Sequence, residues 1–315
     1  MNRKAASVIS FWRCVVLNVT LALAASVTCA QQQPSGQTPS PASSPTPQAT
    51  PTPSLEQRFF ANILRDQRAI WTSPFHAGRD DAKWLAPLGI TTAVLFATDH
   101  RTASKLGDGG DNQTRLRISK DISYGGSIYA TGGIATAFYL AGRAGHNARA
   151  RETGLLGAEA LIDSGIVVEA LKAATQRPRP RADDASGEFF DRGNSFPSGH
   201  AISVWSLATV VAHEYGRRRP LVRVGAYGLA TAVSVSRYTG RNHFLSDVLV
   251  GSALGYGIGR FVYFKHHDPS LDADDGEKQH GEKQHGETRS KLLPLVAPHF
   301  SRAEHTYGLA LAWDF

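Results

Sequence analysis

Five charge-free stretches rich in Ala, Leu, Val and Gly constrain this 315-residue chain more than any other feature of its sequence. Clusters of proline, glycine and charged residues separate them, and none shows a sustained alternation of polar and apolar side chains. Such runs are typical of buried α-helices, whereas a half-exposed strand alternates with a period of two. The pattern therefore predicts an all-α helical bundle. The stretches cover residues 85–98, 124–142, 201–212, 224–236 and 248–259.

The predicted bundle has about six helices, and a hydrophobic content of 42% is enough for one buried core. The last helical span breaks around Gly240, which allows a seventh helix. Near the C-terminus the segment GLALAWDF alternates, so residues 291–315 are predicted as a short β-hairpin. The expected helices lie near residues 55–70, 82–98, 122–143, 152–174, 198–215 and 221–264.

The apolar stretches raise the question of whether the bundle lies inside a membrane. A spanning helix needs about 20 mostly apolar residues, and only residues 124–142 approach that length, diluted by five glycines. The helix expected at 152–174 carries Glu159, Asp163 and Glu169, which hydrocarbon penalises unless they face the protein interior. With a mean hydropathy of −0.24, these features favour a soluble periplasmic bundle. A membrane-embedded bundle is the alternative.

The N-terminus has the layout of a secretory signal: a basic start, an apolar stretch, and small residues before Gln31. We predict cleavage after Ala30 and export to the periplasm or cell envelope, with an uncleaved anchor as the alternative. Both cysteines, Cys14 and Cys29, fall within residues 1–30, so cysteine chemistry is excluded from the mature chain. Part of the formal charge of +7 also lies there. The mature chain is therefore mildly basic, which suits anionic substrates but not nucleic acid.

Two segments without core-forming residues flank the predicted domain at 55–265. Residues 31–54 are mostly Gln, Pro, Ser and Thr, and we interpret them as a disordered linker. Residues 266–290 are charged and contain GEKQH twice in tandem, so they are predicted as a second linker. His280 and His285 of that repeat offer at most a weak metal site.

The first of three notable segments runs from Lys172 to Pro180 (KAATQRPRP). The prolines cannot continue the apolar helix that precedes them, so the helix must end here. Lys172 and Arg179 are thereby fixed at a junction between helix and loop. Taken alone, this segment is better explained by two cations that complement the dipole at the helix C-terminus.

The second segment is FPSGH, followed at once by the helical run AISVWSLATVV. It marks a helix N-terminus, where free N–H groups and the positive end of the dipole bind anions. Ser198 adds a hydroxyl donor, and Gly199 lets the backbone approach an oxyanion closely. His200 is placed to protonate a leaving oxygen. Taken alone, the segment would equally suit an ordinary helix cap.

The third segment is SRYTGRNHFLSD, from Ser236 to Asp247. His243 and Asp247 are four residues apart, so on a helix they share a face and the carboxylate can accept an imidazole N–H. That contact would leave the other ring nitrogen available as a nucleophile. Arg237 supplies a planar donor fork suited to phosphate. Taken alone, a His and an Asp at this spacing more often form a surface pair.

Together, the three segments resemble the signature of the phosphatidic acid phosphatase type 2 and vanadium haloperoxidase superfamily. Lys is followed by six residues and Arg-Pro, then comes PSGH, and then Ser-Arg with five residues before His and three more before Asp. The resemblance covers roughly residues 60–264 and implies an all-helical bundle. Members include periplasmic acid phosphatases and integral-membrane lipid phosphatases.

The resemblance also implies a role for each matched residue. His243 would attack phosphorus, Asp247 would orient His243, and His200 would protonate the leaving group and then activate water. Fixed cations and donors would stabilise the transferring phosphoryl group, so no metal or other cofactor is expected. The phosphoryl oxygens would be held by Lys172, Arg179, Ser198, the Gly199 N–H and Arg237. Three further arginines could extend the positive field without an assigned role: Arg177, Arg181 and Arg241.

These residues predict a metal-independent phosphatase that acts on phosphate monoesters or lipid (pyro)phosphates through a phosphohistidine intermediate. The first alternative is a vanadium-dependent haloperoxidase, because an equivalent pocket binds vanadate, which in a phosphatase is an inhibitor. The second is a non-catalytic exported anion-binding module. Against it stand His200, His243 and Asp247, since phosphate capture needs none of the three. The expected partner is a phosphorylated small molecule or lipid, with contact to a membrane surface as an option.

Overall fold

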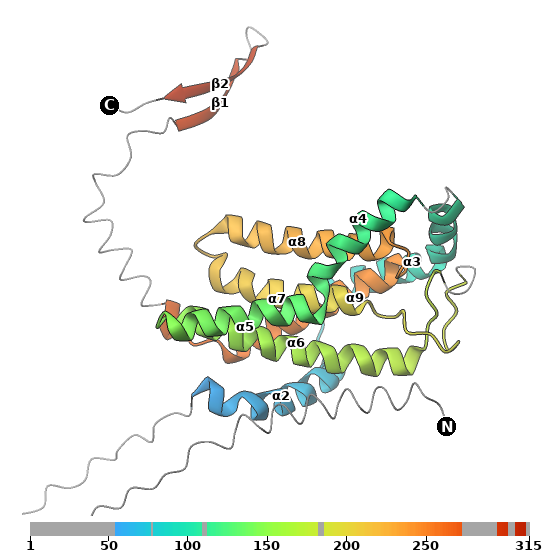
Figure 1. Ribbon diagram of the computed structural model, residues 1–315, viewed down its shortest axis with the longest axis horizontal. Helices are drawn as coiled ribbons and strands as arrows, with labels where there is room; N and C mark the ends of the chain where they lie inside the picture. The colour runs from blue at the N-terminus through green and yellow to red at the C-terminus, as the bar shows by residue number, and fades with distance from the viewer. Residues whose placement is uncertain are drawn as a thin grey trace, which may run out of the picture. The chain divides into compact units, whose positions relative to one another are not determined.

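The computed structural model describes residues 54–76, 78–108, 112–181, 186–272, 295–301 and 306–312. These residues form eight α-helices, two 3₁₀ turns and a two-stranded hairpin (Figure 1), which confirms the all-α fold class. The predicted signal segment, the first linker up to residue 53 and most of the second lie outside the described residues. The helices are α2 (Leu55–Thr72), α3 (Ala82–Asp108), α4 (Gln113–Ser123), α5 (Ile128–Ala144), α6 (Ala148–Thr175), α7 (Gly199–Tyr215), α8 (Pro220–Thr239) and α9 (Leu245–His266). The 3₁₀ turns are η1 (Ser73–His76) and η2 (Tyr124–Gly126).

Helix α4 is the element that the sequence analysis does not predict, because its 11 residues are mostly polar and contain only three large apolar side chains. Its start is fixed by Asn112, whose side chain accepts a hydrogen bond from the Arg115 backbone N–H at 3.1 Å. The helix packs against α8, and the hydroxyls of Ser119 and Thr239 hydrogen-bond at 2.8 Å. The last predicted span is divided into α8 and α9, as the break around Gly240 indicates.

Helix α7 lies at the centre of the bundle and packs against α6, α8 and α9 (Figure 1). The main core joins α6, α7 and α9, where Leu156, Ile202 and Val262 are fully buried. A second cluster between α7 and α8 contains Val204 and Val233. Burial of these apolar faces is the main favourable contribution to folding. The same contacts fix the N-terminus of α7 relative to its neighbours.

Three glycines on α9 allow this helix to approach the α7 backbone closely. A Cβ atom on Gly251 would stand only 2.7 Å from the Ser198 carbonyl oxygen, and Gly255 and Gly259 meet the next turns of α7 in the same way. The Ser198 N–H also donates a hydrogen bond to the Asp247 carbonyl oxygen at 3.0 Å. The second and third motif segments are therefore in direct contact.

The hairpin consists of β1 (Leu295–Ser301) and β2 (Thr306–Ala312). The strands are antiparallel, with Leu295 opposite Ala312 and Ser301 opposite Thr306. Both strands lie within residues 291–315, which are predicted as a hairpin because the segment GLALAWDF alternates with a period of two.

The acidic residues of α6 are divided between the interior and the surface. Glu159 and Asp163 are fully buried, whereas the Glu169 side chain is 66% exposed. In the described part of the chain, no helix combines the length and the apolar character needed to cross a membrane. The two buried carboxylates require compensation of their charge inside the bundle.

Candidate active site

The three motif segments meet where α6 and α8 end and where α7 and α9 begin. The Lys172 Nζ atom lies 3.4 Å from the position that a Cβ on Gly199 would take. His200 is in electrostatic contact with Arg237, His243, Lys172 and Arg179. Close approaches and electrostatic interactions thus place all the residues singled out from the sequence in one region: Lys172, Arg179, Ser198, Gly199, His200, Arg237, His243 and Asp247.

Three cations line this region from different elements. Lys172 pairs with Glu169 at 2.9 Å, and because Glu169 is largely exposed this contact can exchange for an anion at little cost. Arg179 donates to the Asn194 side-chain oxygen at 3.0 Å. Arg237 is buried, and burial together with the neighbouring charge of Arg179 lowers its pKa to about 10. It therefore remains charged at neutral pH.

Two buried donors in the region have no hydrogen-bond partner among the described residues. One is Nε of Arg237, and the other is the hydroxyl of Ser198, which is fully buried. Ser198 occupies the N-cap position of α7, but its side chain makes no capping hydrogen bond. The Ser198 hydroxyl therefore does not cap helix α7. Buried unsatisfied donors are costly, and a bound oxyanion would satisfy both.

His243 is held in one orientation by the backbone of the loop before α7. Its Nδ1 lies 2.7 Å from the Ser195 carbonyl oxygen, which can only accept, so Nδ1 carries the proton. Burial lowers the pKa of His243, so the ring is neutral at pH 7. In this tautomer Nε2 has an available lone pair. That is the state a nitrogen nucleophile requires.

Asp247 acts on His243 differently from the sequence expectation. The nearest approach of its carboxylate to His243 Nδ1 is 3.8 Å, beyond hydrogen-bond range. Its Oδ2 instead accepts from the Ser195 hydroxyl at 2.5 Å and from the Phe244 N–H at 2.9 Å. Burial alone would raise the pKa of Asp247, but His243, Arg177 and Ser195 hold it below its ordinary value. The carboxylate therefore positions Ser195, and the Ser195 carbonyl orients the imidazole.

Arg177 has a structural position rather than the field-extending one expected from the sequence. It is 2% exposed and donates to the Asp247 carboxylate at 2.6 Å, the Asp99 carboxylate at 2.9 Å and the Ser246 hydroxyl at 2.8 Å. Its Nε donates to the Gly187 carbonyl oxygen at 2.8 Å. This buried arginine links α3 to the start of α9.

The sequence analysis missed Ser195 and Asp99 as contributors to the site and assigned no role to Arg177. Asp99 could have been identified from the sequence, because it is a single acidic residue directly after the apolar run at 85–98. Such a side chain must be either exposed or paired with a cation. Ser195 has no comparable signal in the sequence, since it acts through its backbone carbonyl and its hydroxyl. Arg177 has none either, because several arginines surround it in the sequence.

The electrostatic setting of His200 differs from that of His243. Burial, followed by the charges of Arg237, Lys172 and Arg179 and the neighbouring His243, lowers the pKa of His200 to about 3. The ring is therefore neutral at pH 7 when no anion is bound. An anion with two negative charges among these cations would raise the pKa of His200 again. Anion binding and protonation of His200 are thus coupled.

A family model described as the PAP2 superfamily matches residues 153–269, a range that includes all three motif segments. Among curated proteins, a lipid A 1-phosphatase of Porphyromonas gingivalis is 39% identical over 71 residues, covering 22% of this chain and 16% of the relative. A PA-phosphatase related-family protein of Dictyostelium discoideum is 27% identical over 144 residues, covering 40% and 52% of the two chains. The chain thus spans about half of one relative and a smaller part of the other.

Two solved structures are similar to this chain. One is Aquifex aeolicus LpxE, with 18% identity and a TM-score of 0.42, covering 52% of this chain and 93% of that one. The other is the transmembrane PAP2 type phosphatidylglycerolphosphate phosphatase from Bacillus subtilis, with 20% identity and a TM-score of 0.42, covering 65% and 92%.

We predict that Asp99→Asn destabilises the protein by about 1.5–3 kcal/mol, the typical contribution of a hydrogen bond to a charged group. The substitution keeps the shape of the side chain but leaves Arg177 with one carboxylate instead of two. Guanidinium chloride unfolding measures the change. The matched control is Asp80→Asn, which removes an exposed partner of Lys83 and should have no measurable effect. Equal stabilities of the two variants would show that the Arg177 network does not hold the site together.

We also predict that sulfate binding takes up a proton at pH 6. Sulfate has no titratable proton there, and the pKa of His200 rises from about 3 when the anion binds. Binding should accordingly tighten as the pH falls towards 6. Calorimetry in two buffers with different ionisation enthalpies gives the number of protons. His200→Gln should abolish the uptake, and the exposed control His76→Gln should retain it. Proton-free sulfate binding by the parent would refute the coupling.

Proposed function

We propose that the protein is a metal-independent phosphatase acting on lipid phosphates, on the premise that residues 153–269, which a PAP2 superfamily model matches, have the function of that superfamily. The observation that carries the proposal is the pair of buried donors without partners, Ser198 Oγ and Arg237 Nε. They lie among the cations Lys172 and Arg179, next to a neutral histidine whose tautomer is fixed. A tetrahedral phosphoryl group offers the oxygen acceptors that such donors need, and its charge matches the cations.

In the proposed first step, Nε2 of His243 attacks phosphorus while the bond from phosphorus to the ester oxygen breaks. His200, protonated once the substrate dianion is bound, gives its proton to the departing oxygen. In the second step His200 removes a proton from water, whose oxygen attacks phosphorus and releases His243. The products are an alcohol and inorganic phosphate. Developing charge on the phosphoryl oxygens is stabilised by donors that are already in position.

Two observations support a lipid phosphate as the substrate. One curated relative is named a lipid A 1-phosphatase, and the other is named a PA-phosphatase related-family protein. A groove of about 640 Å³ runs between α4 and α8, lined by apolar residues such as Ile118, Ile122 and Val235. Ser236, which precedes Arg237, also lines it. We propose that the groove holds apolar parts of the substrate while its phosphate reaches the cations.

We propose that the protein works at a membrane surface in the periplasm or cell envelope. The signal-like N-terminus supports export. Large apolar side chains are exposed on several helices, among them Trp84 at 80% and Leu221 at 83%. Such side chains suit contact with lipid, where a lipid phosphate is presented.

We predict that His200→Gln slows hydrolysis of alkyl and lipid phosphates on the order of 10²- to 10⁴-fold, the usual contribution of a general acid. The first turnover of p-nitrophenyl phosphate should suffer far less, because p-nitrophenolate leaves without protonation. Single-turnover kinetics separates this step from the later hydrolysis. Equal losses for the two substrate types would contradict the role of His200.

The parent enzyme provides the test of reaction class. Hydrolysis of a lipid phosphate in mixed micelles should persist in EDTA and be inhibited by orthovanadate. Loss of turnover on chelation while the protein remains folded, restored by a divalent ion, would contradict the metal-independent mechanism. Halide oxidation by peroxide in the presence of vanadate, without hydrolysis of any phosphate ester, would instead establish the haloperoxidase alternative.

A further inference from the structure

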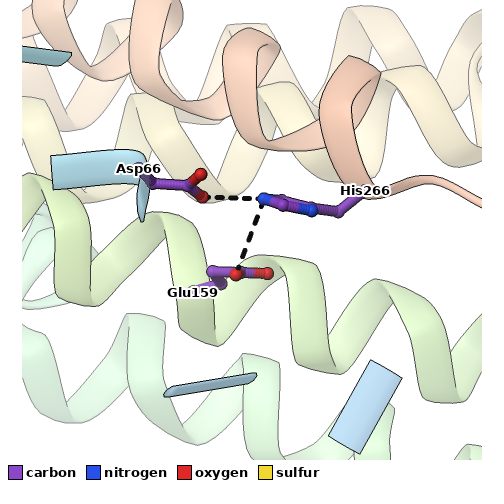
Figure 2. A group of neighbouring side chains, drawn as sticks. All are labelled: Asp66, Glu159 and His266. Atoms are coloured by element: carbon purple, nitrogen blue, oxygen red, sulfur yellow. Dashed lines mark hydrogen bonds and ion pairs between the residues drawn. The ribbon is translucent and has the colours of Figure 1, made fainter. Parts of the chain in front are cut away.

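A second cluster of reactive side chains lies at the opposite end of α9 from His243. Asp66 of α2, Glu159 of α6 and His266 of α9 point toward one another (Figure 2). His266 Nε2 is 2.8 Å from an oxygen of Asp66 and 3.8 Å from an oxygen of Glu159. One ligand atom from each residue lies within 4.8 Å of the other two. No step of the proposed phosphatase reaction uses these residues.

Glu159 is the member whose position needs explanation. Its side chain is completely buried, and neither carboxylate oxygen has a hydrogen-bond partner among the described residues. The Asn62 amide lies near it and favours the ionised form, but does not meet hydrogen-bond geometry. A buried carboxylate without hydrogen bonds requires either a cation or a proton. In Figure 2 its carboxylate is directed at His266.

The surrounding charges are unbalanced. Three buried carboxylates, Asp66, Glu159 and Asp163, lie together, and Lys265 contributes one positive charge through its 2.7 Å contact with Asp66 Oδ1. Gln67 donates to one oxygen of Asp163, and the other has no hydrogen-bond partner among the described residues. With all three carboxylates ionised and His266 neutral, the group would carry two negative charges in excess, and burial raises the pKa values of Glu159 to about 8 and of Asp163 to about 7. A divalent cation would balance it.

We propose that Asp66, Glu159 and His266 bind a divalent transition-metal ion, for which Zn²⁺ is the best fit. One imidazole nitrogen and two carboxylate oxygens suit zinc, whereas magnesium and calcium prefer oxygen ligands alone. At zinc distances of about 2.0–2.2 Å, tetrahedral ligand atoms lie roughly 3.3 Å apart. The separations of 2.8 and 3.8 Å from His266 Nε2 bracket that value. Lys265 occupies only Oδ1 of Asp66, which leaves Oδ2 for the metal.

In a neighbouring cluster, cationic side chains of the protein itself pair with the buried carboxylates. Glu152, Glu214 and His267 also lie within ligand distance of one another. There, however, Arg149 pairs with Glu214 at 3.1 Å, and His267 contacts Glu152 at 2.7 Å. Protein cations thus serve the acids of this cluster, so it carries no proposal. It supplies a matched control on the same helix.

The proposed ion has a structural role, because its ligands come from three helices and include α2. Helix α2 follows the predicted linker and packs on α6 and α9. A metal ion bound by Asp66 would fasten α2 to the bundle. A proton is the competing occupant, since burial and the neighbouring Asp66 and Asp163 raise the pKa of Glu159 to about 8. A bound metal ion would make the melting temperature depend on zinc concentration, whereas a proton would make it depend on pH alone.

The test compares zinc content and thermal stability of the full chain and its variants. Because His280 and His285 can also bind zinc, both are replaced by Ala in every protein compared. Each protein is stripped with EDTA, dialysed against Zn²⁺ and analysed by mass spectrometry of the metal. We expect Glu159→Gln and His266→Gln to hold one zinc ion fewer per chain than the parent. The parent melting temperature should rise with zinc concentration, and that of the two variants should not.

The control Glu152→Gln makes the same change two helical turns away and should keep the parent zinc content and zinc-dependent melting temperature. In EDTA, Glu159→Gln should be at least as stable as the parent, because it removes a buried charge. That result would also show that the variant is folded. Equal zinc content in the parent and Glu159→Gln would overturn the proposal. A melting temperature that responds to pH but not to zinc would identify a proton as the occupant and would overturn it equally.

Discussion

The ion pairs of Arg177 with Asp99 and Asp247 are the interaction on which the candidate active site depends. A buried guanidinium is tolerated only when its donors are matched, and here two carboxylates, a hydroxyl and a carbonyl oxygen match them. The ring of Phe244 also covers the guanidinium, at 4.1 Å from its centroid. Because the partners come from α3, the loop after α6 and α9, one side chain fixes the relative positions of three segments. Asp247 is thereby held where it positions Ser195.

The site combines groups that are fully paired with groups that are not. Asp247 accepts hydrogen bonds on both oxygens, and His243 is fixed through the Ser195 carbonyl. Ser198 and Arg237 instead keep buried donors without partners in the described part of the chain. The paired groups supply rigidity, and the unpaired donors supply affinity for an oxyanion. In the proposed function, this division would allow a fixed constellation to bind phosphate while a nitrogen lone pair remains available for attack.

The motif spacing predicts which residues meet, but not how they contact one another. Proline and glycine at helix ends mark the junctions that carry Lys172 and Gly199, because these residues constrain the backbone locally. The contact of His243 with the Ser195 carbonyl could not be predicted, since it depends on the path of the loop before α7. Helix α4 could not be predicted either, because its sequence is short and mostly polar and it is stabilised by packing on α8.

We propose that His243 Nε2 becomes covalently bound to phosphorus during turnover. The most direct measurement is rapid quenching of the enzyme with a lipid phosphate at high pH, where phosphohistidine survives, followed by peptide mass spectrometry. The account predicts a phosphoryl group on His243, lost on acid treatment and lacking in His243→Asn. A phosphoryl group on another residue, or turnover by His243→Asn with no labelled intermediate, would contradict it.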